Sequence, residues 1–176
     1  MKTTTKLIAT AFTAVALFLG TSNVNAQSTP KSALRFGIGV EGLLPTGNLK
    51  SISKAGLGGT ARLQYGVSDD LALTLTSGYY NFFGREIGNT GVNYDKFGIV
   101  PLKAGVKAFV SQNIYLGAEV GAGFETDGLK DTKLIASPGV GYASQKWDVG
   151  VRYENFSGQG SNYGTVGLRV AYGFGL

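Results

Sequence analysis

Two of the side chains most useful for catalysis are missing from this sequence. The 176 residues contain no His and no Cys. Without His there is no Ser-His-Asp triad, no His-based metal site and no imidazole acid or base. Without Cys there is no disulfide framework, no thiol nucleophile and no zinc site with Cys ligands. A site built from carboxylates alone is one remaining way to provide acid–base catalysis.

Carboxylates alone can provide acid–base catalysis when two of them lie together and their environments separate their pKa values. Glu119 and Glu154 are the only plausible deep candidates in the chain. Each lies among Lys and Arg residues, and neighbouring positive charges keep a carboxylate ionised. We therefore predict that the protein is not an enzyme and that it uses no cofactor.

Two other motifs have a ligand-binding spacing. The segment Gly37–Gly42 (GIGVEG) matches a dinucleotide fingerprint, which works only where the glycines open a helix. The residues that follow, Leu43–Gly47, do not start a helix. We therefore interpret the glycines as small residues that line the wall of a β-barrel. The segment 125–131 gathers three carboxylates that could bind calcium weakly, but Lys130 and Lys133 lie among them and the calcium-loop consensus is absent. We expect a solvated acidic loop and no metal site.

The first 26 residues have the pattern of a secretory signal peptide. Lys2 and Lys6 precede the uncharged apolar run Leu7–Gly20, which is too short to span a bilayer, and Val24–Ala26 provides small residues before a cleavage point. Cleavage would leave 150 of the 176 residues and lower the net charge from +5 to +3, because both lysines leave. So small a charge does not favour a nucleic-acid partner. We predict a signal peptide at 1–26, a short lead at 27–32 and one domain at 33–176.

The rest of the chain alternates apolar residues with small or polar ones at a period of two, as half-buried β-strands do. Eight such runs lie within 34–44, 57–65, 71–79, 100–108, 114–122, 134–142, 147–153 and 166–174. At roughly nine to eleven residues, with seven in the run 147–153, these runs could cross a bilayer as tilted strands. Long polar links (45–55, 81–93, 125–132 and 157–162) alternate with tight ones (67–70, 110–113 and 144–146). This order predicts an all-β fold, an eight-stranded antiparallel up-and-down transmembrane β-barrel with both ends of the chain in the periplasm.

Alternation alone leaves open which face points inward, because soluble lipocalin-like barrels alternate as well. The polar face here is mainly Gly, Ala, Ser and Thr, whereas a water-facing surface is about a quarter to a third charged. Small residues suit the narrow lumen of an eight-stranded barrel. We therefore predict that the apolar face meets lipid. Two prolines, Pro101 and Pro138, fall within predicted strands of a barrel that has no free edge; we expect Pro101 near the extracellular rim and a bulge or a missing ladder bond at Pro138.

The charged residues on the polar face predict a structural ionic network inside the lumen, since buried ions must be paired. Its members are Arg35, Glu41, Arg62, Lys103, Lys107, Glu119, Asp148, Arg152, Glu154 and Arg169, which leaves about two positive charges in excess. Aromatic residues near strand ends predict girdles at the two membrane interfaces. They are Tyr79, Tyr80, Phe82, Phe83, Tyr94, Phe97, Phe109, Trp147, Tyr172 and Phe174.

The signal junction at Ala26-Gln27, the eight Gly-rich strands, the segment Ile99–Gly105 (IVPLKAG) and the terminal Tyr172–Leu176 (YGFGL) resemble the outer-membrane β-barrel domain family. Over about 30–176 the chain is similar to the small porin-family barrels of Bacteroidota, and in shape to the OmpA transmembrane domain and OmpX. The resemblance implies a place in outer-membrane lipid, reached with periplasmic chaperones and the outer-membrane assembly machinery. That machinery reads a final strand ending in an aromatic; here Leu176 is last and Phe174 is the nearest aromatic. The family has no shared catalytic residues.

Three functions stay open at this point. The first is a structural or interaction protein of the outer membrane that displays extracellular loops from a barrel with a filled lumen. The second is a small pore for passive transport, and the third is a soluble ligand-binding barrel. We favour the first, because side chains fill the interior of an eight-stranded barrel. The partner of the loops is not identified by the sequence.

Overall fold

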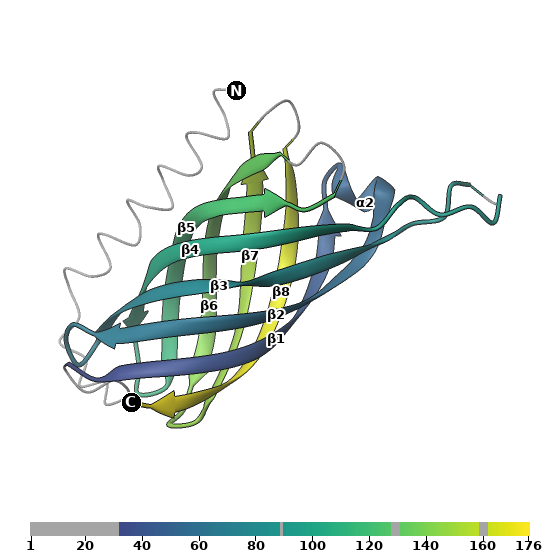
Figure 1. Ribbon diagram of the computed structural model, residues 1–176. Coiled ribbons are helices and arrows are strands. Elements are labelled where there is room, and N and C mark those ends of the chain that lie inside the picture. The colour runs from purple at the N-terminus through teal and green to yellow at the C-terminus, as the bar shows by residue number, and fades with distance from the viewer. Residues whose placement is uncertain (1–31, 89, 128–130, 159–161) are drawn as a thin grey trace.

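The structure is a computed structural model that describes residues 32–88, 90–127, 131–158 and 162–176. The predicted signal peptide and most of the lead lie outside these residues. Eight strands form a closed antiparallel barrel in which each strand pairs with the next and the last pairs with the first (Figure 1). They are β1 (Leu34–Thr46), β2 (Ser53–Gly66), β3 (Leu71–Gly84), β4 (Phe97–Phe109), β5 (Ile114–Glu125), β6 (Thr132–Ala143), β7 (Trp147–Ser157) and β8 (Tyr163–Gly175). The predicted fold class is confirmed.

The strands are longer than the sequence pattern predicted. They contain 11 to 14 residues, because alternation continues past several predicted ends. The clearest case is the third hairpin, where β3 runs on to Gly84 and β4 begins at Phe97, so that the long link covers 85–96 rather than 81–93. The tight links at 67–70, 110–113 and 144–146 are as predicted.

The helical content of the described chain is one short element, α2 (Leu49–Ile52), in the link between β1 and β2. It begins well after the glycine-spaced segment Gly37–Gly42, which lies within β1. That segment therefore opens no helix, in agreement with the interpretation of its glycines as wall residues. Among the described residues, no helix is both long and apolar enough to cross a bilayer.

The outer face of the barrel is apolar. On every strand, large hydrophobic side chains with an exposed fraction of about two fifths or more alternate with buried ones; examples are Ile38, Leu57, Leu75, Leu102, Val120, Leu134, Val151 and Leu168. The charged side chains of the middle of the strands lie inside, including Glu41, Lys103 and Glu154. A lipocalin-like barrel has the opposite arrangement, with an apolar interior and a polar exterior. The predicted orientation of the two faces is therefore found.

Aromatic residues occupy the outer rim only in part. Trp147 packs edge-on against Tyr172, which in turn packs against Phe174, at the end of the barrel that carries the tight links (Figure 1). The prediction of a girdle position is wrong for Tyr80, Phe82 and Phe109, whose side chains are buried inside. All three continue the inward parity of their strands, which outweighs their nearness to a strand end.

The interior is layered along the barrel axis. Beneath the long links lies an apolar plug made of Leu43, Leu49, Tyr80, Phe82, Ile99, Ile135 and Phe156, with Phe97 and Tyr163 packed against it. Phe82 stacks on Phe97 and Phe156 stacks on Tyr163, at centroid distances of 4.9 and 5.0 Å. The charged residues fill the layer below the plug. A second, smaller cluster of Phe109, Tyr115 and Ala143 lies near the tight links.

Three prolines lie within strands: Pro45, which pairs with Thr165 of β8, and the two predicted ones, Pro101 and Pro138. Pro101 and Pro138 interrupt the ladder without shifting it. Pro138 pairs with Ala118 of β5, whereas β6–β7 pairing is missing between Ala136/Asn155 and Gly139/Arg152, with the same register on both sides. Pro101 pairs with Gly123 of β5, and the β3–β4 pairing is missing beside it in the same way. Proline has no backbone N–H to donate, so each of these two prolines lacks pairing with one neighbouring strand. Each keeps its pairing with the other neighbouring strand, β5. Of the two explanations considered for Pro138, the missing ladder bond is the one found.

Gly121 lies where β4 and β5 come very close together. A Cβ placed on Gly121 would overlap the carbonyl oxygen of Leu102, whereas a Cβ on Gly117 of the same strand and face would come no closer than 3.5 Å to the Tyr115 ring. We expect Gly121→Ala to lower the free energy of unfolding by about 1–3 kcal/mol, the usual cost of overpacking, and Gly117→Ala to leave it nearly unchanged. Urea unfolding in detergent micelles measures both, and equal losses would contradict the geometry.

Candidate functional site

Six of the eight strands contribute charged side chains to the middle of the lumen. Glu41 comes from β1, Arg62 from β2, Lys103 and Lys107 from β4, Glu119 from β5, Asp148, Arg152 and Glu154 from β7, and Arg169 from β8. All occupy inward positions of the period-two pattern, and eight of the nine are nine-tenths or more buried, with Asp148 slightly less so. The remaining two strands contribute hydroxyls, Thr74 and Thr76 from β3 and Ser137 from β6. Nine of the ten predicted network members thus come together.

Eight of these residues form a closed ring of alternating charge, which we call the ionic ring. In order around it they are Arg62, Glu119, Lys103, Glu154, Arg152, Glu41, Arg169 and Asp148, which returns to Arg62. Arg62 Nη2 lies 2.9 Å from Glu119 Oε1, and Lys103 Nζ lies 3.4 Å from Glu119 Oε2. Arg152 Nε lies 2.9 Å from Glu154 Oε1. Lys103 also pairs with Glu154, and Arg152 with Glu41.

Hydroxyl groups donate to three of the carboxylates of the ring. Thr60 donates to Glu41 over 2.8 Å, Thr76 to Glu119 over 2.7 Å and Ser137 to Glu154 over 3.0 Å. Tyr80 Oη accepts from Lys103 at 3.2 Å and from Arg152 at 2.9 Å. Buried charges are tolerated when each has both a counter-ion and hydrogen bonds. Every member of the ring has at least two counter-ions, but Glu154 Oε2 and Arg169 Nη2 are buried without a hydrogen-bond partner among the described residues. The ring therefore ties the strands together across the lumen.

Lys107 is attached to the ring as a branch. Its Nζ pairs with Asp148, whose other oxygen accepts a 2.7 Å hydrogen bond from Tyr115 Oη. Lys107 Nζ also lies over the Tyr115 ring, 4.1 Å from its centroid. The described network therefore holds five cations and four carboxylates, one positive charge in excess rather than the two expected.

Two charged positions differ from the sequence-based prediction. Arg35 is not part of the ionic network: its guanidinium donates to the backbone carbonyls of Ser144, at 3.3 Å, and of Gln145 in the β6–β7 turn. Its position at the start of β1 puts it next to that turn and out of reach of the carboxylates. Lys133 was missed, although its odd-numbered position on β6 gives it inward parity. It is buried and lies 3.2 Å from Asp131 and 3.1 Å from the Gly158 carbonyl.

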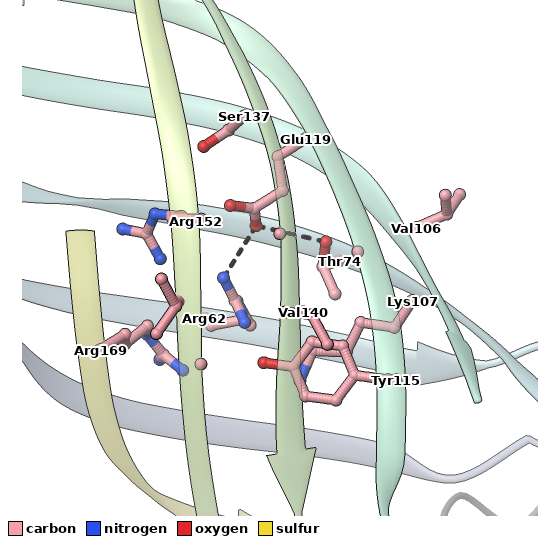
Figure 2. A pocket seen from close by; sticks show the side chains of 14 residues that line it. Arg62, Thr74, Val106, Lys107, Tyr115, Glu119, Ser137, Val140, Arg152 and Arg169 are labelled. Atoms are coloured by element: carbon pink, nitrogen blue, oxygen red, sulfur yellow. Dashed lines mark hydrogen bonds and ion pairs between the residues drawn. The ribbon is translucent and has the colours of Figure 1, made fainter. Parts of the chain in front are cut away.

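Two small cavities border the ionic ring in the described part of the lumen. The first, of about 30 Å³, is lined by Arg62, Lys107, Tyr115, Glu119, Arg152 and Arg169, together with smaller residues. Figure 2 shows its labelled side chains, with Glu119 pointing toward Arg62 and Thr74 and the Tyr115 ring below them. The second cavity is of similar size and lies nearer to the tight links. Neither cavity is lined by two carboxylates: the first has Glu119 and the second has Asp148. Glu119 and Glu154, the sequence-based candidates, are each held by two cations.

The acidic loop does not gather its carboxylates where the structure describes it. Asp127 accepts a 2.8 Å hydrogen bond from the Gly98 amide, Asp131 pairs with Lys133 and Glu125 accepts from Tyr163 Oη at 2.7 Å. Residues 128–130 lie outside the described chain. Within 32–88, 90–127, 131–158 and 162–176, no group of three potential ligands is placed to hold a metal ion.

Comparison with solved structures places the chain among small barrels. No family model matches it, and no curated protein sequence does. Ail, the attachment invasion locus protein of Yersinia pestis, superposes with a TM-score of 0.58 at 17% identity over 82% of this chain and 99% of that chain. The N-terminal β-barrel domain of Pseudomonas aeruginosa OprF gives 0.55 at 14% identity over 80% and 97%. Neisserial surface protein A gives 0.53 at 17% identity over 81% and 97%. The chain therefore has the fold of small eight-stranded outer-membrane barrels.

Proposed function

We propose that this protein is an integral outer-membrane barrel that works as a rigid anchor, with a lumen closed by side chains and loops displayed to the outside of the cell. The fold is that of outer-membrane barrels, whereas the location of this protein and its role as an anchor are proposed. The observation that carries it is the combination of an apolar outer face with a charged, paired interior. Only lipid is a suitable solvent for such an outer face, since soluble monomers expose apolar patches of a few hundred Å² at most.

The filled lumen supports an anchor rather than a pore. The ionic ring crosses the interior at the level of Arg152 and Lys103, and the apolar plug lies above it. A solute would have to displace both layers, and separating a buried ion pair leaves two desolvated charges. Single-channel recordings in a planar bilayer test this: we expect no stable openings, and steady conductance would favour the small-pore function instead.

The links at the far end of the barrel from the C-terminus supply the displayed surface. The longest is 85–96, and its described residues, 85–88 and 90–96, project well beyond the strands (Figure 1). It continues the β3–β4 hairpin through the bridge Glu86–Asn93 and a 2.7 Å hydrogen bond from the Ile87 amide to Val92 O. Ile87, Val92 and Tyr94 are exposed on it. An ordered ribbon with exposed apolar side chains suits contact with another protein, a role that accords with the name of the attachment protein Ail.

An epitope inserted after Gly88 tests the display proposal. We expect an antibody to detect this epitope on intact cells, whereas the same epitope inserted in the 110–113 turn should be detected only after the outer membrane is permeabilised. Both sites lie in links between strands, so each insertion leaves the barrel ladder in place. Detection of the 110–113 epitope alone on intact cells would reverse the orientation, and detection of neither in the membrane fraction would contradict the outer-membrane location.

A further inference from the structure

The charges of the lumen are not balanced, and the excess lies at one place. The ionic ring itself is neutral, with four cations and four carboxylates, so Lys107 provides the additional positive charge. Lys107 pairs with Asp148, the same carboxylate that Arg62 and Arg169 approach only to 3.7 Å. Asp148 is thus shared among three cations. The part of the lumen around it is the most positive part of the network.

Arg169 has a donor that the protein does not use. Its Nε donates to Thr60 at 3.2 Å and lies 3.6 Å from Glu41, and its Nη1 lies 3.7 Å from Asp148. Its Nη2 is buried and has no hydrogen-bond partner within the part of the chain that the structure describes. The residue is 2% exposed. An unpaired donor on a buried cation costs several kcal/mol unless a ligand satisfies it.

The free Nη2 lies beside the second cavity. A Cβ on Gly37, which lines that cavity, would lie 4.0 Å from Arg169 Nη2. Gly37 pairs directly with Gly173 across β1 and β8, and a Cβ on Gly173 would lie 3.2 Å from Arg35 Nη2. Two guanidinium groups therefore flank a floor of two glycines. Arg35, Arg62, Lys146 and Arg169 line the cavity together with one carboxylate, Asp148.

We propose that this cavity is a binding site for one small monovalent anion of halide size, held by Arg169 Nη2 above Gly37 and Gly173. The site goes beyond the anchor function and does not depend on it. One bound halide balances the charge of Lys107 and gives the unused Arg169 donor an acceptor. The cavity of about 30 Å³ holds roughly two water-sized spheres at about 10–15 Å³ each. It is therefore large enough for chloride or bromide.

Bromide is the direct probe for this site. Crystals of the detergent-folded protein grown in sodium bromide should give an anomalous peak in contact with Arg169 Nη2. Gly37→Ala should abolish the peak, because the new methyl occupies the place of the anion, while its nearest other contact is 3.4 Å from the Tyr172 carbonyl and leaves the fold intact. Gly59→Ala is the matched control: it adds the same methyl on the outer face, where nothing lies within 4 Å.

A measurement in solution distinguishes a specific anion site from the other possible outcome, an adventitious ion only. At equal ionic strength, the wild type and Gly59→Ala should unfold at a higher temperature in sodium chloride than in sodium gluconate, with saturation as chloride rises. Gly37→Ala should lose this difference. An equal Tm in both salts for the wild type, or a bromide peak of unchanged height in Gly37→Ala, would overturn the proposal.

Discussion

Replacing Glu154 by Leu should lower the free energy of unfolding by about 3–5 kcal/mol, the cost of removing one partner of a buried ion pair. Glu154 Oε1 pairs with Lys103 and Arg152 and accepts a hydrogen bond from Ser137. All four groups are buried, so Leu leaves two cations with fewer counter-ions and no access to bulk water. Urea unfolding of the protein in lipid vesicles measures the loss.

The control removes a carboxylate outside the ionic ring. Asp69 lies exposed in the 67–70 turn, and Asp69→Asn should change stability by no more than about 0.5 kcal/mol. The double variant Glu154→Leu, Lys103→Leu should recover part of the loss, because it no longer buries a lysine that has lost one of its two carboxylate partners. A double variant as unstable as the two single losses added together would show that the pair acts through packing and not through charge.

Replacing Leu168 by Arg should cost about 2–4 kcal/mol if this part of β8 lies near the middle of the bilayer. Leu168 lies on the outer face, flanked by Gly42 of β1 and Val151 of β7. An arginine there has no carboxylate partner and must reach the interface through lipid. Equilibrium folding into phosphatidylcholine vesicles measures the difference from the wild type.

The depth of the substitution provides the matched control. Leu34 has the same outward orientation but begins β1 at the end of the barrel that carries the tight links, and Leu34→Arg should cost at most about 1 kcal/mol. If both variants fold into vesicles as well as the wild type, the outer face does not meet hydrocarbon. If both unfold equally, the cost does not depend on depth, and a membrane environment does not explain it.

The period of two was sufficient to predict which side chains face the lumen. It placed Glu41, Arg62, Lys103 and Glu154 on one face of their strands, and all four lie inside. The order of long and tight links predicted the closed antiparallel barrel in the same way. These properties depend on local alternation and turn chemistry, which a single sequence contains.

The partners within the lumen could not be predicted in this way. Glu41 on β1 pairs with Arg152 on β7, two strands that are not neighbours, so the contact depends on the radius and shear of the closed barrel. Arg35 has the correct parity, yet its height along the axis directs it to the turn carbonyls. Tyr80 and Phe82 were assigned to the rim by their nearness to a predicted strand end, and the longer strand places them in the interior.

The ionic ring has a consequence for how the barrel is assembled in the membrane. Closure joins the first strand to the last, and Glu41 of β1 reaches both Arg169 of β8 and Arg152 of β7 across that seam. Arg62 of β2 reaches Asp148 of β7 across it as well. A half-assembled sheet would therefore carry uncompensated charges along both of its open ends. We expect these unpaired charges to disfavour incomplete intermediates and to make the final joining of β1 and β8 cooperative.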